Sequence, residues 1–131
     1  MDKQELNHIA QTRKKVLSPK QIKTLAEMYA EKNDVPIFNM YPKAEIARFG
    51  AKDGRAFDEV HFNDLNIVMG VLKWWVNVKN YRGAQIDIDS DGYMVELDSD
   101  MFDADSTIVE HHSPSLIITI AEALTKIKEK L

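Results

Sequence analysis

The stretch QIDIDSDGYMVELDSD, residues 85–100, holds the side chains of this sequence whose types and spacing could do chemistry. Asp87, Asp89 and Asp91 stand at alternate positions and are followed by Gly92. A calcium loop of the EF-hand kind begins in this way, because alternate carboxylates bind the ion and the glycine permits a sharp turn. The twelfth position of such a loop normally holds a bidentate glutamate, and here it holds Asp98. These four aspartates are the candidate metal ligands of the chain.

The same stretch also has the alternation of a β-hairpin. Apolar residues alternate with mostly polar ones on both sides of a Ser-Asp-Gly turn, namely Ile86, Ile88, Tyr93, Val95 and Leu97. An EF-hand loop has a helix on each side, whereas both flanks here have the period of a strand. A hairpin accounts for all of these residues, and a calcium loop accounts for four. We therefore expect a hairpin without a bound metal or other cofactor, and we keep a small-ligand or Ca²⁺-binding module as the alternative.

Acidic residues are concentrated in one part of the sequence. Residues 83–110 contain nine acidic residues and neither Lys nor Arg. The rest of the chain contains 12 acidic residues and all 17 basic ones, a net charge of +5. Such a separation can steer a basic partner toward one face of a protein. A solvated hairpin edge would have the same composition, so the charge alone leaves both interpretations open.

We expect a non-enzymatic protein that binds another protein through this acidic surface. In this interpretation the hairpin and the loop after it imitate a row of phosphates for a basic partner. Neither nucleic acid nor a membrane is expected as the partner, and the sequence leaves a monomer and a homodimer open. The expected partner-binding residues are Asp87, Asp89, Asp91, Asp98, Asp100, Asp103 and Asp105.

Other candidate catalytic residues lack the arrangement that their chemistry needs. Glu110, His111 and His112 could contribute to a zinc site, but the other histidines, His8 and His61, have no ligand-like spacing to them. A serine follows the paired histidines without the sequence of a nucleophile elbow. No Gly-rich phosphate loop is present. We therefore expect no enzymatic activity.

A DNA-binding regulator is the further alternative. Basic residues that could contact phosphates cluster in the N-terminal part, namely Arg13, Lys14, Lys15, Lys20 and Lys23. A helix-turn-helix would need a second helix soon after Asp34. The sequence continues instead as VPIFNMYP, which disfavours a helix.

Two helices are predicted before residue 34. The first covers residues 2–16. The second begins with Ser18 as the N-cap and Pro19 at the first helical position, and its apolar residues follow at helical spacing. Asn33, Asp34 and Pro36 are expected to end it.

The rest of the N-terminal half is predicted to be irregular. We expect an extended piece up to Met40, a single helical turn over residues 43–49 and a loop that contains Gly50 and Gly54. Residues 1–60 are thus expected to be helical and irregular.

Residues 61–131 are predicted as an α-β-β-(β)-α unit. Asn63 can cap the next helix. This helix is apolar except for one narrow polar stripe, so we expect it to be central and buried on several sides. The hairpin follows, with a third strand expected around residues 107–111. An amphipathic helix that starts with Ser113 and Pro114 closes the chain.

Length and composition indicate one domain over residues 1–131. A chain of 131 residues can bury a sizeable core, and the absence of cysteine excludes disulfides. The N-terminus lacks the apolar region of a signal peptide, and no apolar run could span a bilayer. A cytoplasmic protein is expected.

From His61 onward, the layout resembles the phage ABA-sandwich family of small phage and prophage proteins. HFNDLNIVMGVLKWW matches the start of the family's apolar helix through Phe62 and Asp64, DGYMVELD matches its Gly-Tyr strand, and SPSLIITIAEALTKI matches its closing helix. Residues 1–60 do not fit, and the family's sheet tryptophans are absent. The resemblance implies a phage or prophage origin, a bacterial host and α-β-α layers, and it supplies no catalytic residues. A host or defence protein is the partner that we expect with it.

The expected fold class is α+β, as an α-β-α sandwich. A small antiparallel β-hairpin or meander would pack with a buried central helix and a C-terminal amphipathic helix, with the N-terminal helices added. The predicted core consists of Leu65, Val68, Leu72, Trp75, Ile117, Ile120 and Leu124 against Ile86, Ile88, Val95 and Leu97.

Overall fold

The fold is taken from a computed structural model that describes residues 17–51, 57–78, 83–98 and 108–130. Its helices and strands follow the order α2, β1, β2, β3, α3, β4, β5, β6 and α4, with one 3-10 turn between β1 and β2. The predicted helix over residues 2–16 lies outside this description. The α+β class expected from the sequence is confirmed.

Helix α2, Pro19–Asn33, begins and ends where the sequence predicts. The side chain of Ser18 accepts a hydrogen bond from the N–H of Gln21, whose own side chain accepts from the N–H of Ser18. This capping box satisfies two N–H groups that a helix start leaves without partners. At the other end Asp34 takes the left-handed conformation, with φ of 53° and ψ of 51°, and closes the helix.

The stretch that was expected to be irregular forms an antiparallel sheet, so that prediction was wrong. Its strands are β1, Ile37–Tyr41, β2, Ile46–Gly50, and β3, Phe57–His61, in the order β1-β2-β3. Only Pro42–Ala44 forms a helical turn, of the 3-10 kind. On β2 buried residues alternate with an exposed residue, Arg48, which is the strand period, and on β3 Val60 is buried between exposed neighbours. The strands are short, and proline and glycine residues around them concealed this alternation in the sequence.

Helix α3, Leu65–Val78, is the apolar helix that was expected to be central. Its first turn is held by Asp64, whose carboxylate accepts from the N–H of Asn66 at 2.9 Å and whose C=O accepts from Val68. The N-cap is therefore Asp64 and not Asn63. Both Asn and Asp side chains can cap a helix. The turn after β3 places Asp64, and not Asn63, directly before the first helical residue, Leu65.

The C-terminal half contains a regular three-stranded sheet and the closing helix. The strands β4, Gly83–Asp89, β5, Gly92–Asp98, and β6, Ile108–Ser113, are antiparallel and pair in the order β4-β5-β6. This confirms the hairpin and the third strand. Helix α4, Leu116–Lys130, follows. Its N-cap is Ser115, whose hydroxyl accepts from Ile118, and not Ser113 as the sequence suggested.

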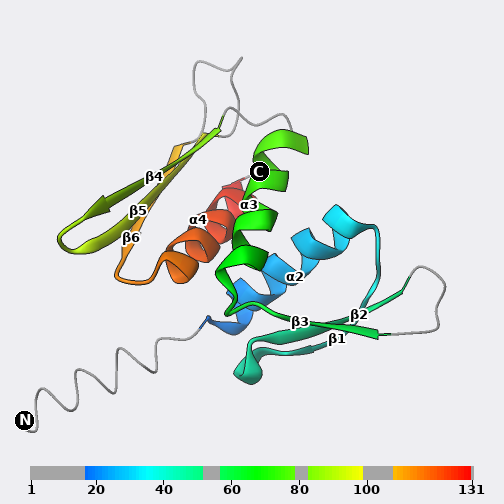
Figure 1. The fold of residues 1–131 in the computed structure, drawn as a ribbon. Coiled ribbons are helices and arrows are strands. Elements are labelled where there is room, and N and C mark those ends of the chain that lie inside the picture. Colours follow the sequence, from blue (N-terminus) through cyan, green and yellow to red (C-terminus); the bar gives the residue numbers. More distant parts are fainter. Residues whose placement is uncertain (1–16, 52–56, 79–82, 99–107, 131) are drawn as a thin grey trace, which may run out of the picture.

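The helices form the middle layer of the molecule, and one sheet lies on each side of them (Figure 1). Helix α2 contacts β1 and β2, while α4 contacts β5 and β6, and the three helices contact one another. The order of layers thus differs from the expected α-β-α arrangement. The sequence analysis placed two helices on opposite faces of one sheet, because it did not identify the N-terminal sheet that covers α2.

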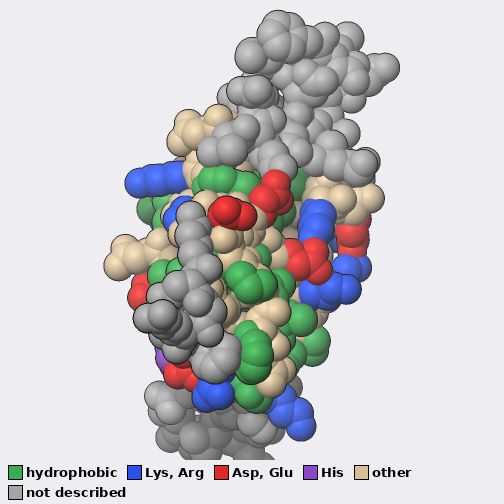
Figure 2. Space-filling view, turned by 90° about the vertical axis from the view of Figure 1, so that its right-hand side faces the viewer, with side chains coloured by type: hydrophobic (Ala, Val, Ile, Leu, Met, Phe, Trp, Pro, Cys, Tyr) green, Lys and Arg blue, Asp and Glu red, His purple; other side chains and the backbone are tan. Residues whose placement is uncertain are grey.

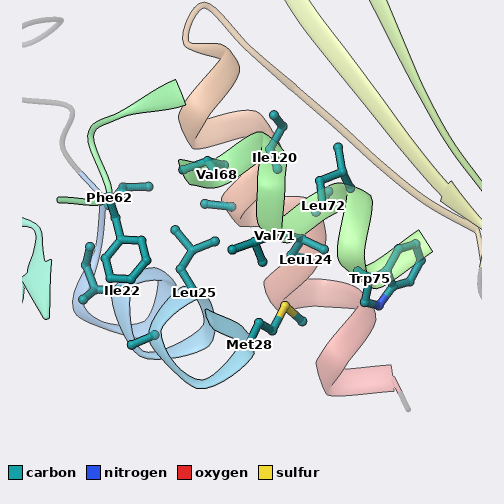
Figure 3. Packing of buried hydrophobic residues seen from close by; sticks show 14 of the residues in the cluster. Ile22, Leu25, Met28, Phe62, Val68, Val71, Leu72, Trp75, Ile120 and Leu124 are labelled. Atoms are coloured by element: carbon teal, nitrogen blue, oxygen red, sulfur yellow. The ribbon is translucent and has the colours of Figure 1, made fainter. Parts of the chain in front are cut away.

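The core lies where the three helices meet, and it extends to the inner face of each sheet. Val68, Val71 and Leu72 of α3 point into it together with Ile120 and Leu124 of α4 (Figure 3). Helix α2 and the residue after β3 add a set that the predicted core did not include, namely Ile22, Leu25, Met28 and Phe62.

Most of the predicted core residues are buried, and two are not. Val68, Leu72, Trp75, Ile120, Leu124, Val95 and Leu97 are buried, while Ile86 and Ile117 are partly buried. Leu65 is 40% exposed and Ile88 is 76% exposed. Both exposed residues stand at an end of their element, where the periodicity continues but no neighbouring element covers it.

An aromatic cluster joins α2 to the N-terminal sheet. The ring of Tyr29 lies 4.7 Å from that of Phe49 and 6.2 Å from that of Phe62, measured between centroids. Burial raises the pKa of Tyr29 above its ordinary value, and the negative charge of Asp58 raises it further. The phenol of Tyr29 therefore favours its neutral form in the folded protein.

Leu72→Ala should lower the free energy of unfolding by about 2–5 kcal/mol, because it leaves a cavity between the central helix and its neighbours. Leu65→Ala is the matched control on the same helix, and we expect a loss below about 1 kcal/mol since its side chain is partly exposed. Urea unfolding of both variants measures the difference. Equal losses would contradict the central place of α3.

The stability of the protein should decrease as the pH rises above about 10, where Tyr29 of the unfolded chain ionises before Tyr29 of the folded chain. The stabilisation is fully present below the unfolded pKa and is lost as the pH rises through the higher folded pKa. Tyr29→Phe should reduce this alkaline loss, and Tyr41→Phe, which removes an exposed phenol, serves as the control. Urea unfolding at neutral and alkaline pH gives the comparison. An unchanged pH dependence in Tyr29→Phe would contradict the assignment.

Candidate functional site

The hairpin of β4 and β5 holds the residues that the sequence singled out. Ser90 and Asp91 form the two-residue turn, and Asp89 pairs with Gly92 across it. The carboxylate of Asp89 accepts hydrogen bonds from the N–H of Asp91 at 2.8 Å and from that of Gly92 at 3.0 Å. An aspartate that hydrogen-bonds to the backbone in this way stabilises a turn. Asp89 thus has a structural task at the tip of the hairpin.

Gly92 is required by the packing of its own backbone. Its φ is 141°, and a Cβ added to it would lie 2.4 Å from the carbonyl oxygen of Ser113 and 2.8 Å from the Cα of Pro114. No side chain fits so close to the backbone that links β6 to α4. In the sequence Gly92 matches the glycine of a calcium loop. The structure gives another reason for a glycine at this position, which is the close approach of the backbone at Ser113 and Pro114.

The turn that carries Asp87, Asp89 and Asp91 belongs to a β-hairpin and lacks the flanking helices of an EF-hand loop. Strands and not helices flank the turn, and the carboxylate of Asp89 faces the N–H groups of its own turn. Within residues 17–51, 57–78, 83–98 and 108–130, no group of three or more His, Asp or Glu side chains could hold a metal ion. The side chain of Asp98 lies outside the described part of the chain.

Four of the seven expected partner-binding residues lie on the hairpin, and the side chains of three of them are described. Asp87 is partly buried on β4, while Asp89 and Asp91 are exposed at the tip. Asp98 ends β5, and its side chain is not described. Asp100, Asp103 and Asp105 lie outside the described residues.

The outer face of this sheet is polar and acidic. Gln85, Asp87, Met94 and Glu96 occupy it, because Ile86 and Val95 pair on the opposite, inner face. The side-chain amide of Gln85 donates to both carboxylate oxygens of Asp87 at 3.2 Å. This contact orients the carboxylate without neutralising its charge.

The paired histidines lie on β6. In the register His111 stands opposite Val95 and His112 opposite Met94, so the two positions belong to opposite faces of the sheet. Their side chains lie outside the description, and a zinc site with Glu110 stays untested.

Two of the five basic residues in the DNA-binding alternative are described, and both belong to α2. Lys20 forms an ion pair with Glu129 of α4, and Lys23 lies 4.0 Å from Glu27 of its own helix. Strand β1 follows α2, so the second helix of a helix-turn-helix is absent at this place. Arg13, Lys14 and Lys15 lie outside the described residues.

The sequence analysis missed a polar network on the outer face of the N-terminal sheet. Glu59 accepts from Arg48 at 3.3 Å and lies 3.5 Å from His61, and Arg48 stacks on the ring of Tyr41 at 5.2 Å. Tyr41 also accepts a hydrogen bond from Asn39. The apolar residues on both sides of Arg48 are the sequence signal for β2, but the strand is too short for this signal to stand out. The carboxylate of this network has the guanidinium of Arg48 beside it, whereas the hairpin has neither Lys nor Arg in its sequence.

Opposite charges are mixed on the side of the molecule that bears α2 and the N-terminal sheet. Figure 2 shows Lys and Arg side chains beside Asp and Glu side chains there, with hydrophobic side chains between them. Ion pairs of the described residues include Lys128 with Glu27, Lys20 with Glu129, and Arg48 with Glu59. The β4–β5 hairpin, by contrast, contains acidic residues and neither Lys nor Arg.

Comparisons with known proteins give no relative: no family model, curated protein or solved structure matches the chain. The resemblance to the phage ABA-sandwich family therefore stays a prediction. None of the helices in the described ranges is long and apolar enough to cross a membrane.

Asp89→Ala should lower the free energy of unfolding by about 1 kcal/mol, because two N–H groups of the turn lose their acceptor. Asp89→Asn is the matched control: it removes the charge and keeps an oxygen that can accept the same hydrogen bonds. Thermal or urea unfolding of the two variants measures the difference. Equal stability of both would show that the carboxylate does not hold the turn.

Proposed function

We propose that this chain is a non-enzymatic binding protein whose acidic hairpin docks a basic partner protein. One observation carries the proposal: the hairpin presents Asp87, Asp91 and Glu96 on its outer face and tip without a basic residue of its own. Its turn lies at the end of the sheet that is far from α3 (Figure 1). A partner can therefore approach the tip from several directions.

Acidic residues on the helices differ from those of the hairpin, and this contrast supports the proposed binding surface. On α2 and α4, Glu27 is paired with Lys128, and Glu122 lies 3.8 Å from Lys126 and accepts a hydrogen bond from Gln21. The described fold thus places basic residues beside these two carboxylates of α2 and α4, whereas the hairpin has neither Lys nor Arg in its own sequence.

The strand register adds a second argument. Glu96 of β5 stands directly opposite Glu110 of β6. Like charges at directly opposite positions of an antiparallel pair destabilise a sheet. The sheet itself has no need for two acids at these positions, because Lys or Thr would fit either of them equally well. A basic partner that covered the sheet would relieve the repulsion and would associate faster at low salt.

The origin and the identity of the partner remain part of the proposal. The resemblance of residues 61–131 to the phage ABA-sandwich family suggests a phage or prophage protein in the cytoplasm of a bacterial host. A host or defence protein with a basic groove is then the partner that we propose. Asp100, Asp103 and Asp105, which are expected partner-binding residues from the sequence, lie outside the described residues.

The test compares partner capture by wild type and by a neutralised variant, Asp87→Asn with Asp91→Asn and Glu96→Gln. Asp89 is left unchanged because it holds the turn. The matched control neutralises three acids on α2 and α4, Glu27→Gln, Glu31→Gln and Glu129→Gln. Exposed ion pairs contribute only about 0–1 kcal/mol each, so the control should stay folded.

We expect proteins retained from a bacterial lysate by immobilised wild type and by the control to be lost from the hairpin variant. Retention by wild type should also weaken as salt is added, because the proposed contacts are charge pairs at a surface. Circular dichroism checks that all three proteins are folded. An unchanged set of retained proteins in the hairpin variant would refute the acidic surface as the binding site.

A further inference from the structure

The outer edge of β4 offers backbone groups for pairing. Among the strands that the structure describes, β4 pairs with β5 alone. Asp89 and Gly92 close a two-residue turn, and in such a hairpin the closing pair is hydrogen-bonded and every second pair repeats this. The N–H and C=O groups of Ala84, Ile86 and Ile88 consequently face away from β5. These three residues present a row of donors and acceptors along the edge.

Strand β4 lacks the features that usually protect such an edge. Its seven residues pair with β5 without a bulge, and they include neither Lys nor Pro. The edge strand β1 differs, since its register shifts between Ile37 and Asn39, and the side chain of Asn39 accepts from the N–H of Met40. The other edge of that sheet, β3, has five residues where β4 has seven, and both strands carry two acidic residues. Of these three edges β4 is the most open to another strand.

An apolar groove runs beside this edge, between α3 and β4. It has a volume of about 220 Å³. Its lining consists of Met69, Leu72, Val76, Ala84 and Ile86, with Lys73 and Asn77. Helix α4 packs on β5 and β6, so the inner face of the sheet is covered there and Val95 and Leu97 are fully buried. Along β4 the cover is incomplete.

The exposure of the inner side chains of β4 shows this incomplete cover. Ala84, Ile86 and Ile88 lie on the inner face in line with Leu97, Val95 and Tyr93, their partners in the register. Ala84 is exposed, Ile86 is partly buried and Ile88 is 76% exposed. An added strand would cover this row and would place its own inner side chains in the groove.

We propose that the partner binds as an extended segment that adds a fourth strand to β4, with alternating apolar and basic side chains. This proposal rests on the function proposed above and names the form of the partner. The apolar side chains would enter the groove against Met69 and Val76, while the basic ones would lie on the outer face beside Asp87. Strand addition supplies backbone hydrogen bonds, and pockets for alternate side chains supply specificity.

Charge decides against a second copy of this chain as the occupant. Two β4 strands that paired with each other would bring Asp87 and Asp89 of one copy close to the same acidic residues of the other. Like charges across a strand pair are destabilising, whereas a Lys or Arg at these positions would be attracted. The same acids thus disfavour self-pairing and favour a basic strand.

The probe for the test is a capped synthetic peptide of alternating Val and Lys with the length of β4. A peptide of the same composition with Pro at its centre is the control, since Pro cannot donate and interrupts strand pairing. Binding is measured by fluorescence anisotropy at low salt, and hydrogen exchange of the backbone amides is followed by NMR.

Two uncharged variants test the edge and the groove separately. Ile88→Pro removes an outward N–H at an exposed position, and Ala84→Leu fills part of the groove. We expect each to weaken binding of the alternating peptide by about tenfold or more, which corresponds to about 1.4 kcal/mol. In wild type the peptide should slow hydrogen exchange at Ala84, Ile86 and Ile88.

The outcomes separate this proposal from the acidic surface itself. If both peptides bind wild type equally, and only neutralisation of Asp87, Asp91 and Glu96 abolishes binding, the strand addition is refuted and the acidic surface stands. If neither peptide binds at low salt, strand addition is refuted, and lysate capture decides on the acidic surface. A dimer in sedimentation that Ile88→Pro dissociates would refute the peptide in favour of a second copy.

Discussion

The burial of α3 is the constraint on which the rest of the structure depends. This helix has apolar side chains on most of its circumference, so water would be in contact with hydrocarbon on several sides of an isolated helix. Helices α2 and α4 both contact it, and β4 reaches it from the sheet. Burial of apolar surface is worth about 25 cal/mol per Å², which is why the most apolar helix lies at the centre.

The way in which α3 is covered also explains the asymmetry of the C-terminal sheet. Helix α4 packs along β5 and β6, and the residues of β5 that face it are fully buried. Strand β4 is left with α3 alone, and the two meet along a groove and not along a closed interface. The exposed Ile88 and the open edge of β4 follow from the same geometry. A protein that buries its central helix so fully thus retains one apolar row at its margin.

The electrostatic organisation follows the layers. Between α2 and α4, Lys128 pairs with Glu27 and Lys20 with Glu129, so these carboxylates have cations close by. On the outer face of the N-terminal sheet, Arg48 plays the same part for Glu59. The hairpin has neither Lys nor Arg. Strand β4 has an apolar groove and an open edge on one side and carboxylates on the other. These features are complementary to an extended segment that is apolar on one face and basic on the other.

The sequence by itself determined the elements whose causes are local. Ser18, Pro19 and Gln21 are enough to begin α2, because a cap and a capping box act within one turn. The alternation around Ser90 and Asp91 likewise predicts the hairpin, since side-chain period and turn chemistry are properties of neighbouring residues. The central place of α3 could be predicted as well, because the apolar circumference is visible in the order of residues.

Only the tertiary structure decided the features that depend on residues far apart in the chain. The N-terminal sheet exists because short strands at β1, β2 and β3 meet and cover α2, and each strand alone is too short to be recognised. Gly92 is fixed by the backbone at Ser113, twenty-one positions further along the chain. The periodicity of Ile86 and Ile88 predicts that both side chains point to the inner face of the sheet. It cannot predict that the helices cover Ile86 in part and leave Ile88 exposed. The acidic candidates could be found from sequence, whereas the groove beside them arises from the separation of α3 and β4.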